Sequence, residues 1–132
     1  MNLELFNRWY DTLPTQKQIK GVLHNKDGYC CLGWATEVVR GPNCWRWLTP
    51  SEYTASLSTL TGDMYMSPDD VDKAMGFDAV IMTTQANCYK QGVRHLEVQK
   101  ISISSFLSTY NDAGYSFDFI RRLADTYIKK EA

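Results

Sequence analysis

The chain has 132 residues, 44% of them hydrophobic, which is enough for one hydrophobic core and too little for two ordinary domains. Its 14 basic and 15 acidic residues leave a net charge of -1, so no global field argues for DNA, RNA or an anionic membrane as an obligate partner. We therefore predict a single domain spanning residues 1–132 with no membrane partner, in which a nucleic-acid role is disfavoured and would need a local basic patch.

The expected location follows from what the sequence lacks. Residues 1–10 include Glu4 and Arg8 and have no apolar core of the length that a signal peptide needs, and no run of about 20 apolar residues occurs anywhere. The four cysteines stand at positions 30, 31, 44 and 88. Because two are adjacent and no secretory signal is seen, we expect reduced thiols in a cytoplasmic protein.

Two helices are predicted in the first third of the chain. Apolar residues at helical spacing indicate an amphipathic helix over residues 3–13, which Pro14 ends. A second such pattern predicts a helix over about 31–39, which Gly41 and Pro42 end.

Between these helices, residues 18–31 have the pattern of a β-hairpin closed by an Asn-Lys-Asp-Gly turn. If the loop has four residues, His24 faces Tyr29 across the ladder and Val22 faces Cys31. His24 and Cys31 would then lie diagonally on one face of the hairpin.

The middle of the chain gives weaker signals. Residues 41–48 are dense in aromatic side chains and fit a loop or a short strand, and Thr49 or Ser51 could cap a short helix that runs through Leu60.

A clearer helix begins after Ser67, which we expect at the N-cap, with Pro68 at the first helical position and Gly76 at the C-terminal cap. Residues 78–84 and 93–98 are weaker strand candidates. Together with the hairpin they are predicted to form one small antiparallel sheet.

The C-terminal third is the best specified. An apolar helical face covers residues 103–110, residues 111–114 interrupt it, and Ser116 caps a last helix. The expected fold class is α+β: a helix-rich domain with a small antiparallel sheet and a C-terminal helical hairpin.

Two motifs, read together, carry a family resemblance. One is the Gly-Tyr-Cys-Cys-Leu-Gly stretch at 28–33, and the other is Asn-Asp-Ala-Gly-Tyr-Ser-Phe at 111–117. In their order and spacing they resemble small uncharacterised proteins of tailed bacteriophages and prophages. This chain departs from that pattern at Trp34 and in a longer insertion from Ala79 to Val98. The resemblance implies a phage origin and a compact accessory protein, and it implies no particular reaction.

The sharpest enzymatic hypothesis is a cysteine nucleophile. Cys30 or Cys31 lies at a predicted helix N-terminus, where the helix dipole lowers a thiol pKa, and His24 or His95 could act as the base of a hydrolase or transferase. Against this, Cys31 shares the apolar stripe of its helix, and free cysteine is among the most often buried residues. We expect both cysteines to be structural.

A metal site or a cofactor is not predicted. A zinc site would have to gather Cys30 or Cys31, Cys44, Cys88 and a histidine from separate segments, and the C-x-x-C pattern is absent. No glycine-rich phosphate loop is present either.

A set of aromatic and basic residues is the better candidate for a ligand site. Indole rings can stack on a nucleobase, and arginine or histidine can bind phosphate, so this composition suits a nucleotide-type ligand. The set is Trp34, Arg40, Trp45, Arg46, Trp47, Arg94 and His95. The competing interpretation is that the tryptophans fill the core, Arg40 caps a helix C-terminus and Arg46 is solvated.

The sequence therefore favours a non-enzymatic phage accessory protein that binds and sequesters or blocks a component of the host cytoplasm, with a nucleotide-type immune signal as the most concrete ligand. The alternatives are the cysteine enzyme and a protein inhibitor of a host enzyme. A helix-turn-helix role for the last two helices is disfavoured, because Asp118 and Asp125 accompany the arginines of a largely apolar helix. The oligomeric state is left open, a homo-oligomer included.

Overall fold

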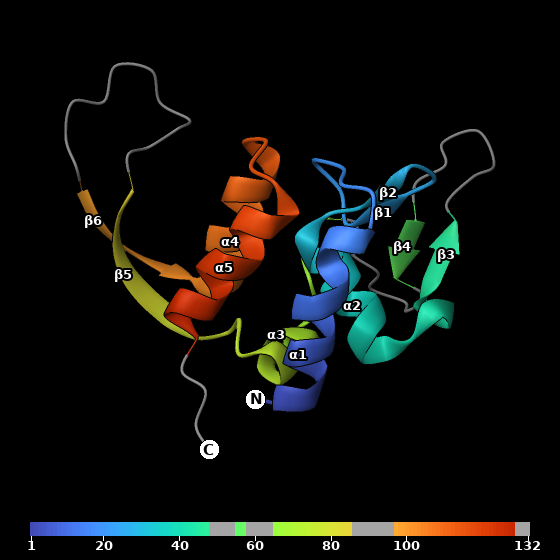
Figure 1. The fold of residues 1–132 in the computed structure, drawn as a ribbon, viewed down its shortest axis with the longest axis horizontal. Coiled ribbons are helices and arrows are strands. Elements are labelled where there is room, and N and C mark those ends of the chain that lie inside the picture. Colours follow the sequence, from blue (N-terminus) through green and yellow to red (C-terminus); the bar gives the residue numbers. More distant parts are fainter. Residues whose placement is uncertain (48–54, 58–64, 86–96, 129–132) are drawn as a thin grey trace.

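The fold is described from a computed structural model, which covers residues 1–47, 55–57, 65–85 and 97–128. These residues form helices and three separate two-stranded antiparallel sheets. The helices occupy the middle of the molecule, and two of the β-hairpins lie at its opposite ends (Figure 1). The predicted α+β class, with a C-terminal helical pair, is confirmed.

The helices follow the predicted segments closely. They are α1 (Leu3–Thr12), α2 (Cys31–Arg40), α3 (Asp69–Met75), α4 (Ile103–Asp112) and α5 (Phe117–Tyr127), with short 3-10 turns at Leu13–Thr15 and Pro42–Cys44. Side-chain oxygens of Asn2, Ser102 and Ser116 cap α1, α4 and α5. Each cap satisfies a backbone N–H that the first turn of a helix leaves without a partner.

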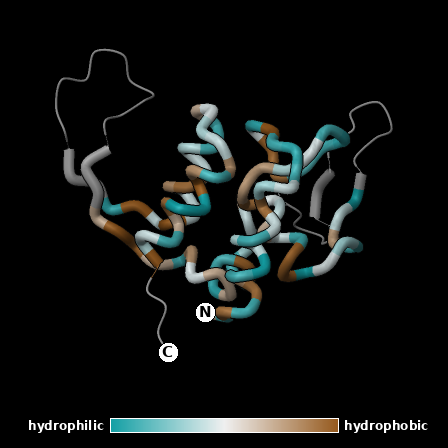
Figure 2. The backbone as a smooth tube through the Cα atoms, in the orientation of Figure 1, coloured by the Kyte–Doolittle hydropathy of each residue, from teal (hydrophilic) through white to brown (hydrophobic). Residues whose placement is uncertain are grey.

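One core joins these helices. Hydrophobic and hydrophilic residues alternate along them (Figure 2), so that each helix turns an apolar stripe inward. The fully buried large side chains of the core include Phe6, Trp9, Leu32, Phe77, Leu107 and Ile120.

The strands differ from the prediction in their partners. They pair as β1 (His24–Asn25) with β2 (Gly28–Tyr29), β3 (Trp45–Trp47) with β4 (Ala55–Leu57), and β5 (Val80–Gln85) with β6 (Glu97–Ser102). The prediction of a single sheet was wrong, because β5 and β6 pair only with each other among the described residues.

Three local predictions also need correction. The predicted hairpin over 18–31 is confined to β1 and β2, although His24 does face Tyr29 as expected. The helix expected between Thr49 or Ser51 and Leu60 contains strand β4 instead. The N-cap of α3 is Pro68, and the Ser67 hydroxyl donates 2.5 Å to Asp72 Oδ1 rather than capping the helix.

The two sequence motifs meet in space. Asn111 Oδ1 accepts hydrogen bonds from the Cys31 amide and from Gln18 Nε2, both at 3.2 Å. Asn111 Nδ2 donates to the Ile19 carbonyl at 2.8 Å, and Asp112 Oδ1 accepts from the Gly21 amide at 3.0 Å. The late motif therefore fastens the segment before the first hairpin to the start of α2.

Candidate functional site

Four aromatic rings from the early hairpin, α2 and β3 lie together, and we call His24, Tyr29, Trp34 and Trp45 the aromatic cluster. The rings of His24 and Tyr29 are stacked, with centroids 4.0 Å apart and planes 6° apart. Trp34 meets Tyr29 edge-on at 5.1 Å, and Trp45 is tilted against His24 at 5.1 Å. The rings of Tyr29, Trp34 and Trp45 are partly exposed, whereas His24 is buried.

Two polar side chains fix these rings. Glu37 Oε1 accepts from the Tyr29 hydroxyl at 2.8 Å and from Trp45 Nε1 at 3.0 Å. Trp34 Nε1 donates to Thr12 Oγ1 at 2.8 Å. Both indole N–H groups are thus satisfied inside the protein, and the orientation of both tryptophans is set before any ligand arrives.

The charge states in the cluster follow from burial and from Glu37. Burial, aided by the hydrogen bond to the Glu37 carboxylate, holds the pKa of Tyr29 far above its usual value. Burial lowers the pKa of His24, whose Nδ1 donates 2.7 Å to the Gly28 carbonyl. At neutral pH the cluster therefore holds a neutral phenol and a neutral imidazole beside one carboxylate.

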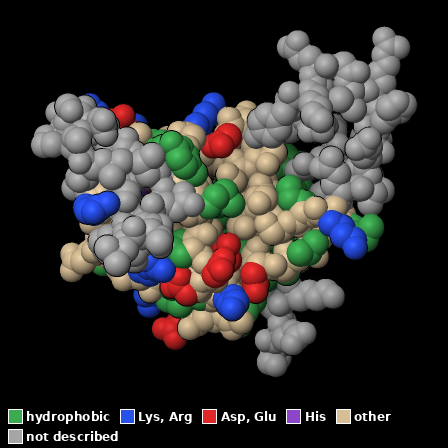
Figure 3. All heavy atoms as spheres, turned by 180° about the vertical axis from the view of Figure 1, so that it is seen from behind, with side chains coloured by type: hydrophobic (Ala, Val, Ile, Leu, Met, Phe, Trp, Pro, Cys, Tyr) green, Lys and Arg blue, Asp and Glu red, His purple; other side chains and the backbone are tan. Residues whose placement is uncertain are grey.

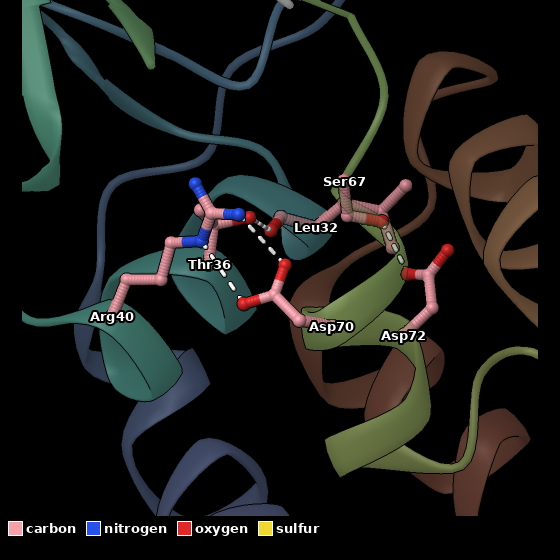
Figure 4. A network of polar contacts seen from close by, with 6 residues as sticks. All are labelled: Leu32, Thr36, Arg40, Ser67, Asp70 and Asp72. Atoms are coloured by element: carbon pink, nitrogen blue, oxygen red, sulfur yellow. Dashed lines mark hydrogen bonds and ion pairs between the residues drawn. The ribbon is translucent and has the colours of Figure 1, made fainter. Parts of the chain in front are cut away.

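Arg40, which we predicted as a phosphate ligand, is paired within the protein. Its Nε and Nη2 donate to the two carboxylate oxygens of Asp70 at 3.1 and 2.7 Å, so the guanidinium fork links α2 to α3 (Figure 4). The same contact raises the pKa of Arg40 and lowers that of Asp70. A ligand phosphate would have to displace Asp70 to reach this fork.

Of the remaining predicted ligand residues, Arg46 is the one whose side chain the structure describes. Arg46 is exposed in β3, and side chains alternate along a strand, so it lies on the face opposite Trp45. Trp47 pairs with Ala55 in the same ladder. Arg94 and His95 lie outside the described residues.

The adjacent cysteines are buried at the start of α2. Cys30 is the N-cap, and its Sγ accepts from the Gly33 amide at 3.3 Å, while Cys31 is fully buried. Burial raises the pKa of Cys30 to about 12 and that of Cys31 well above its ordinary value. Desolvation outweighs the N–H groups of the helix start, so neither thiol has the low pKa that a nucleophile needs.

Sequence reasoning singled out neither Glu37 nor Tyr29 as a site residue. A signal existed for both. Glu37 is the only charged residue between Gly28 and Val39, and it stands three positions after Trp34, on the same side of a helix. Tyr29 follows from the hairpin register, which places it opposite His24.

Outside the aromatic cluster, we considered metal-binding groups, cavities and surface charge among the described residues. No group of three or more His, Cys, Asp or Glu within them could hold a metal ion. A cavity of about 250 Å³ near the end of α5 is lined by Met1, Val80, Tyr127 and Ile128 among others, away from the aromatic cluster. On the face shown in Figure 3, acidic and basic side chains are interspersed among scattered hydrophobic ones.

Comparison with known proteins identifies a family. Residues 1–128 match the family described as a domain of unknown function, DUF8296. The chain belongs to the DUF8296 family. No curated protein and no solved structure matches this DUF8296 chain. In the described part of the chain, no helix combines the length and the hydropathy that crossing a membrane requires.

Proposed function

We propose that this chain is a non-enzymatic accessory protein of phage origin that sequesters or blocks a component of the host cytoplasm. The observation that carries the proposal is the convergence of Trp34 and Trp45 with His24 and Tyr29 into one partly exposed aromatic cluster. The cysteine enzyme is not proposed further, because the thiols of Cys30 and Cys31 are buried and their pKa values are raised.

The ligand class that suits this cluster is a nucleotide-type defence signal. Stacking on an aromatic side chain contributes about 1–3 kcal/mol per base and needs a planar partner. Since hydrogen bonds to Thr12 and Glu37 hold the indole rings of Trp34 and Trp45, little side-chain freedom would be lost on binding. Arg40 does not contribute to this proposal, because its Nε and Nη2 bind Asp70.

The test is a thermal-unfolding screen of the purified protein against a panel of mononucleotides and cyclic dinucleotides. A ligand at 100 times its Kd stabilises the folded state by about 2.7 kcal/mol, which raises Tm by several degrees. Trp45→Leu keeps an apolar side chain but removes the planar face, and it should abolish the shift. Tyr115→Leu is the matched control, because Tyr115 is 43% exposed and its ring packs against Tyr110 and Phe119, outside the aromatic cluster.

Sequestration also requires that the ligand survives. Nucleotide that co-purifies from phage-infected cells should be released chemically intact on denaturation. A panel without any shift, combined with full biological activity of the Trp45→Leu protein, would overturn the proposal. Recovery of one stoichiometric host protein in place of a nucleotide would instead favour the protein inhibitor.

A further inference from the structure

One oxygen of the Glu37 carboxylate has no hydrogen-bond partner among the described residues. Both donors that reach this side chain, the Tyr29 hydroxyl and Trp45 Nε1, bind the same atom, Oε1. Oε2 accepts no hydrogen bond from the described residues, and no lysine, arginine or histidine among them forms an ion pair with Glu37. Glu37 is only partly exposed, so this oxygen belongs to a half-buried carboxylate among aromatic rings.

The Oε2 atom of Glu37 favours a ligand that donates a hydrogen bond. An ionised carboxylate can only accept hydrogen bonds, and it accepts them more strongly than a neutral oxygen does. The two donors on Oε1 also hold the side chain in one orientation, so the acceptor is fixed before a ligand binds. A ligand that turned a carbonyl or a phosphate toward Oε2 would meet repulsion instead.

Resting on the proposed function, we infer that the aromatic cluster recognises a guanine-type base, with its ring against the tryptophans and its N–H edge on Glu37 Oε2. Guanine carries two neighbouring donors on one edge, the ring N1–H and the 2-amino group. Adenine and cytosine present an amino group beside an acceptor nitrogen, and uracil presents one N–H between two carbonyls. Only the guanine edge offers a carboxylate two donors and no facing acceptor.

The test measures binding of four nucleoside 5′-monophosphates, those of guanosine, inosine, adenosine and uridine, to the full chain by titration calorimetry. Hydrogen bonding of a base edge discriminates by about 1–3 kcal/mol, so the guanosine form should bind about 10- to 100-fold more tightly than the adenosine form. The inosine form keeps N1–H and lacks the 2-amino group, and it should fall between them.

Glu37→Gln tests the assignment to this side chain. The glutamine oxygen can still accept from Tyr29 and Trp45, but its NH2 group replaces Oε2 and turns a donor toward the donors of guanine. The preference for guanosine over adenosine should fall to within about threefold. Glu4→Gln is the control, because Glu4 is an exposed carboxylate on α1 and should leave the preference unchanged.

The outcomes separate the two claims. If the adenosine form binds as tightly as the guanosine form, or if Glu37→Gln keeps the full preference, the guanine assignment is wrong and the binding function stands. If none of the four monophosphates and no member of the nucleotide panel binds, the nucleotide-type ligand is wrong and the guanine assignment fails with it. Should Glu37→Gln not fold, the order of affinities in the unaltered chain still decides the assignment.

Discussion

At the scale of single residues, Asn111 shows how a motif can be structural. It is fully buried at the end of α4 and uses both ends of its amide, accepting from Cys31 N and donating to the Ile19 carbonyl. The sequence pattern predicted that residues 111–114 interrupt the helix. The helix in fact continues to Asp112, because the Asn111 side chain binds distant backbone rather than its own turn.

Asn111→Ala should lower the free energy of unfolding by about 2–4 kcal/mol, because it removes the partners of the buried Cys31 amide and the half-buried Ile19 carbonyl. Urea denaturation followed by circular dichroism measures the change. Asn7→Ala, at an exposed position of α1, is the matched control and should shift stability by less than about 0.5 kcal/mol. Equal stability of the two variants would show that the contacts of Asn111 contribute little.

At the scale of elements, the close approach of α2 to the first hairpin depends on Gly33. A Cβ added there would lie 1.7 Å from the Leu23 carbonyl oxygen and 2.5 Å from its carbon. Those are backbone atoms, so no side-chain rotation can relieve the clash. The second glycine of the early motif is therefore explained by packing between two elements.

For Gly33→Ala, helix propensity and packing against Leu23 predict opposite changes in stability. Helix propensity alone predicts a gain of about 0.5–1 kcal/mol for alanine inside a helix. The clash with Leu23 predicts instead a loss of more than about 3 kcal/mol, or failure to fold, because α2 must move away from the hairpin.

The comparison variant is Gly21→Ala, whose φ of +84° is strained for alanine but whose Cβ would have no neighbour within 4 Å. It should cost only about 1–2 kcal/mol. Thermal unfolding of both variants gives the answer, and a Gly33→Ala protein as stable as the unaltered chain would contradict the packing explanation.

At the scale of the whole molecule, Asp72 couples stability to pH. This α3 residue is only 9% exposed, Ser67 donates a hydrogen bond to its carboxylate, and hydrogen bonding by Ser67 and Ser104 acts to lower its pKa. Burial outweighs these bonds, and with the negative charges of Asp69 and Asp78 it raises the pKa of Asp72 to about 6. A folded-state pKa above the unfolded value means that folding takes up a proton.

This residue should make the protein more stable in mild acid than at neutral pH. Its contribution is fully present below about pH 4, near the unfolded pKa, and it is lost as the pH rises through about 6. Asp72→Asn should therefore gain stability relative to the unaltered chain as the pH rises from 4 to 7, by about 1–3 kcal/mol.

Urea midpoints at several pH values measure this difference, and subtracting the two curves removes the contribution of groups such as Asp70, whose lowered pKa acts in the opposite direction. Asp11→Asn controls for loss of an exposed carboxylate that is not among the charges acting on Asp72, and it should run parallel to the unaltered chain. A pH-independent difference between Asp72→Asn and the unaltered chain would contradict the raised pKa.

What the sequence by itself determined are the features that depend on neighbours within a few positions. Helical periodicity and capping residues located α1, α2, α4 and α5, and the turn residues of the first hairpin gave the pairing of His24 with Tyr29. A helix needs only bonds four residues apart, and a tight turn sets the register beside it. Helical periodicity, capping residues and turn residues can therefore be interpreted without knowledge of the rest of the chain.

Tertiary structure alone decided which distant side chains meet. Arg40 binds Asp70 of another helix, Asn111 reaches Cys31, and β5 pairs with β6 apart from the other hairpins. Glu37 became a site residue only when β3 brought Trp45 to it. Such contacts depend on burial and on competition among many possible partners, so a local sequence pattern does not predict them. For this reason Trp34 and Trp45 of the aromatic cluster were predicted as site residues, whereas Glu37 was missed.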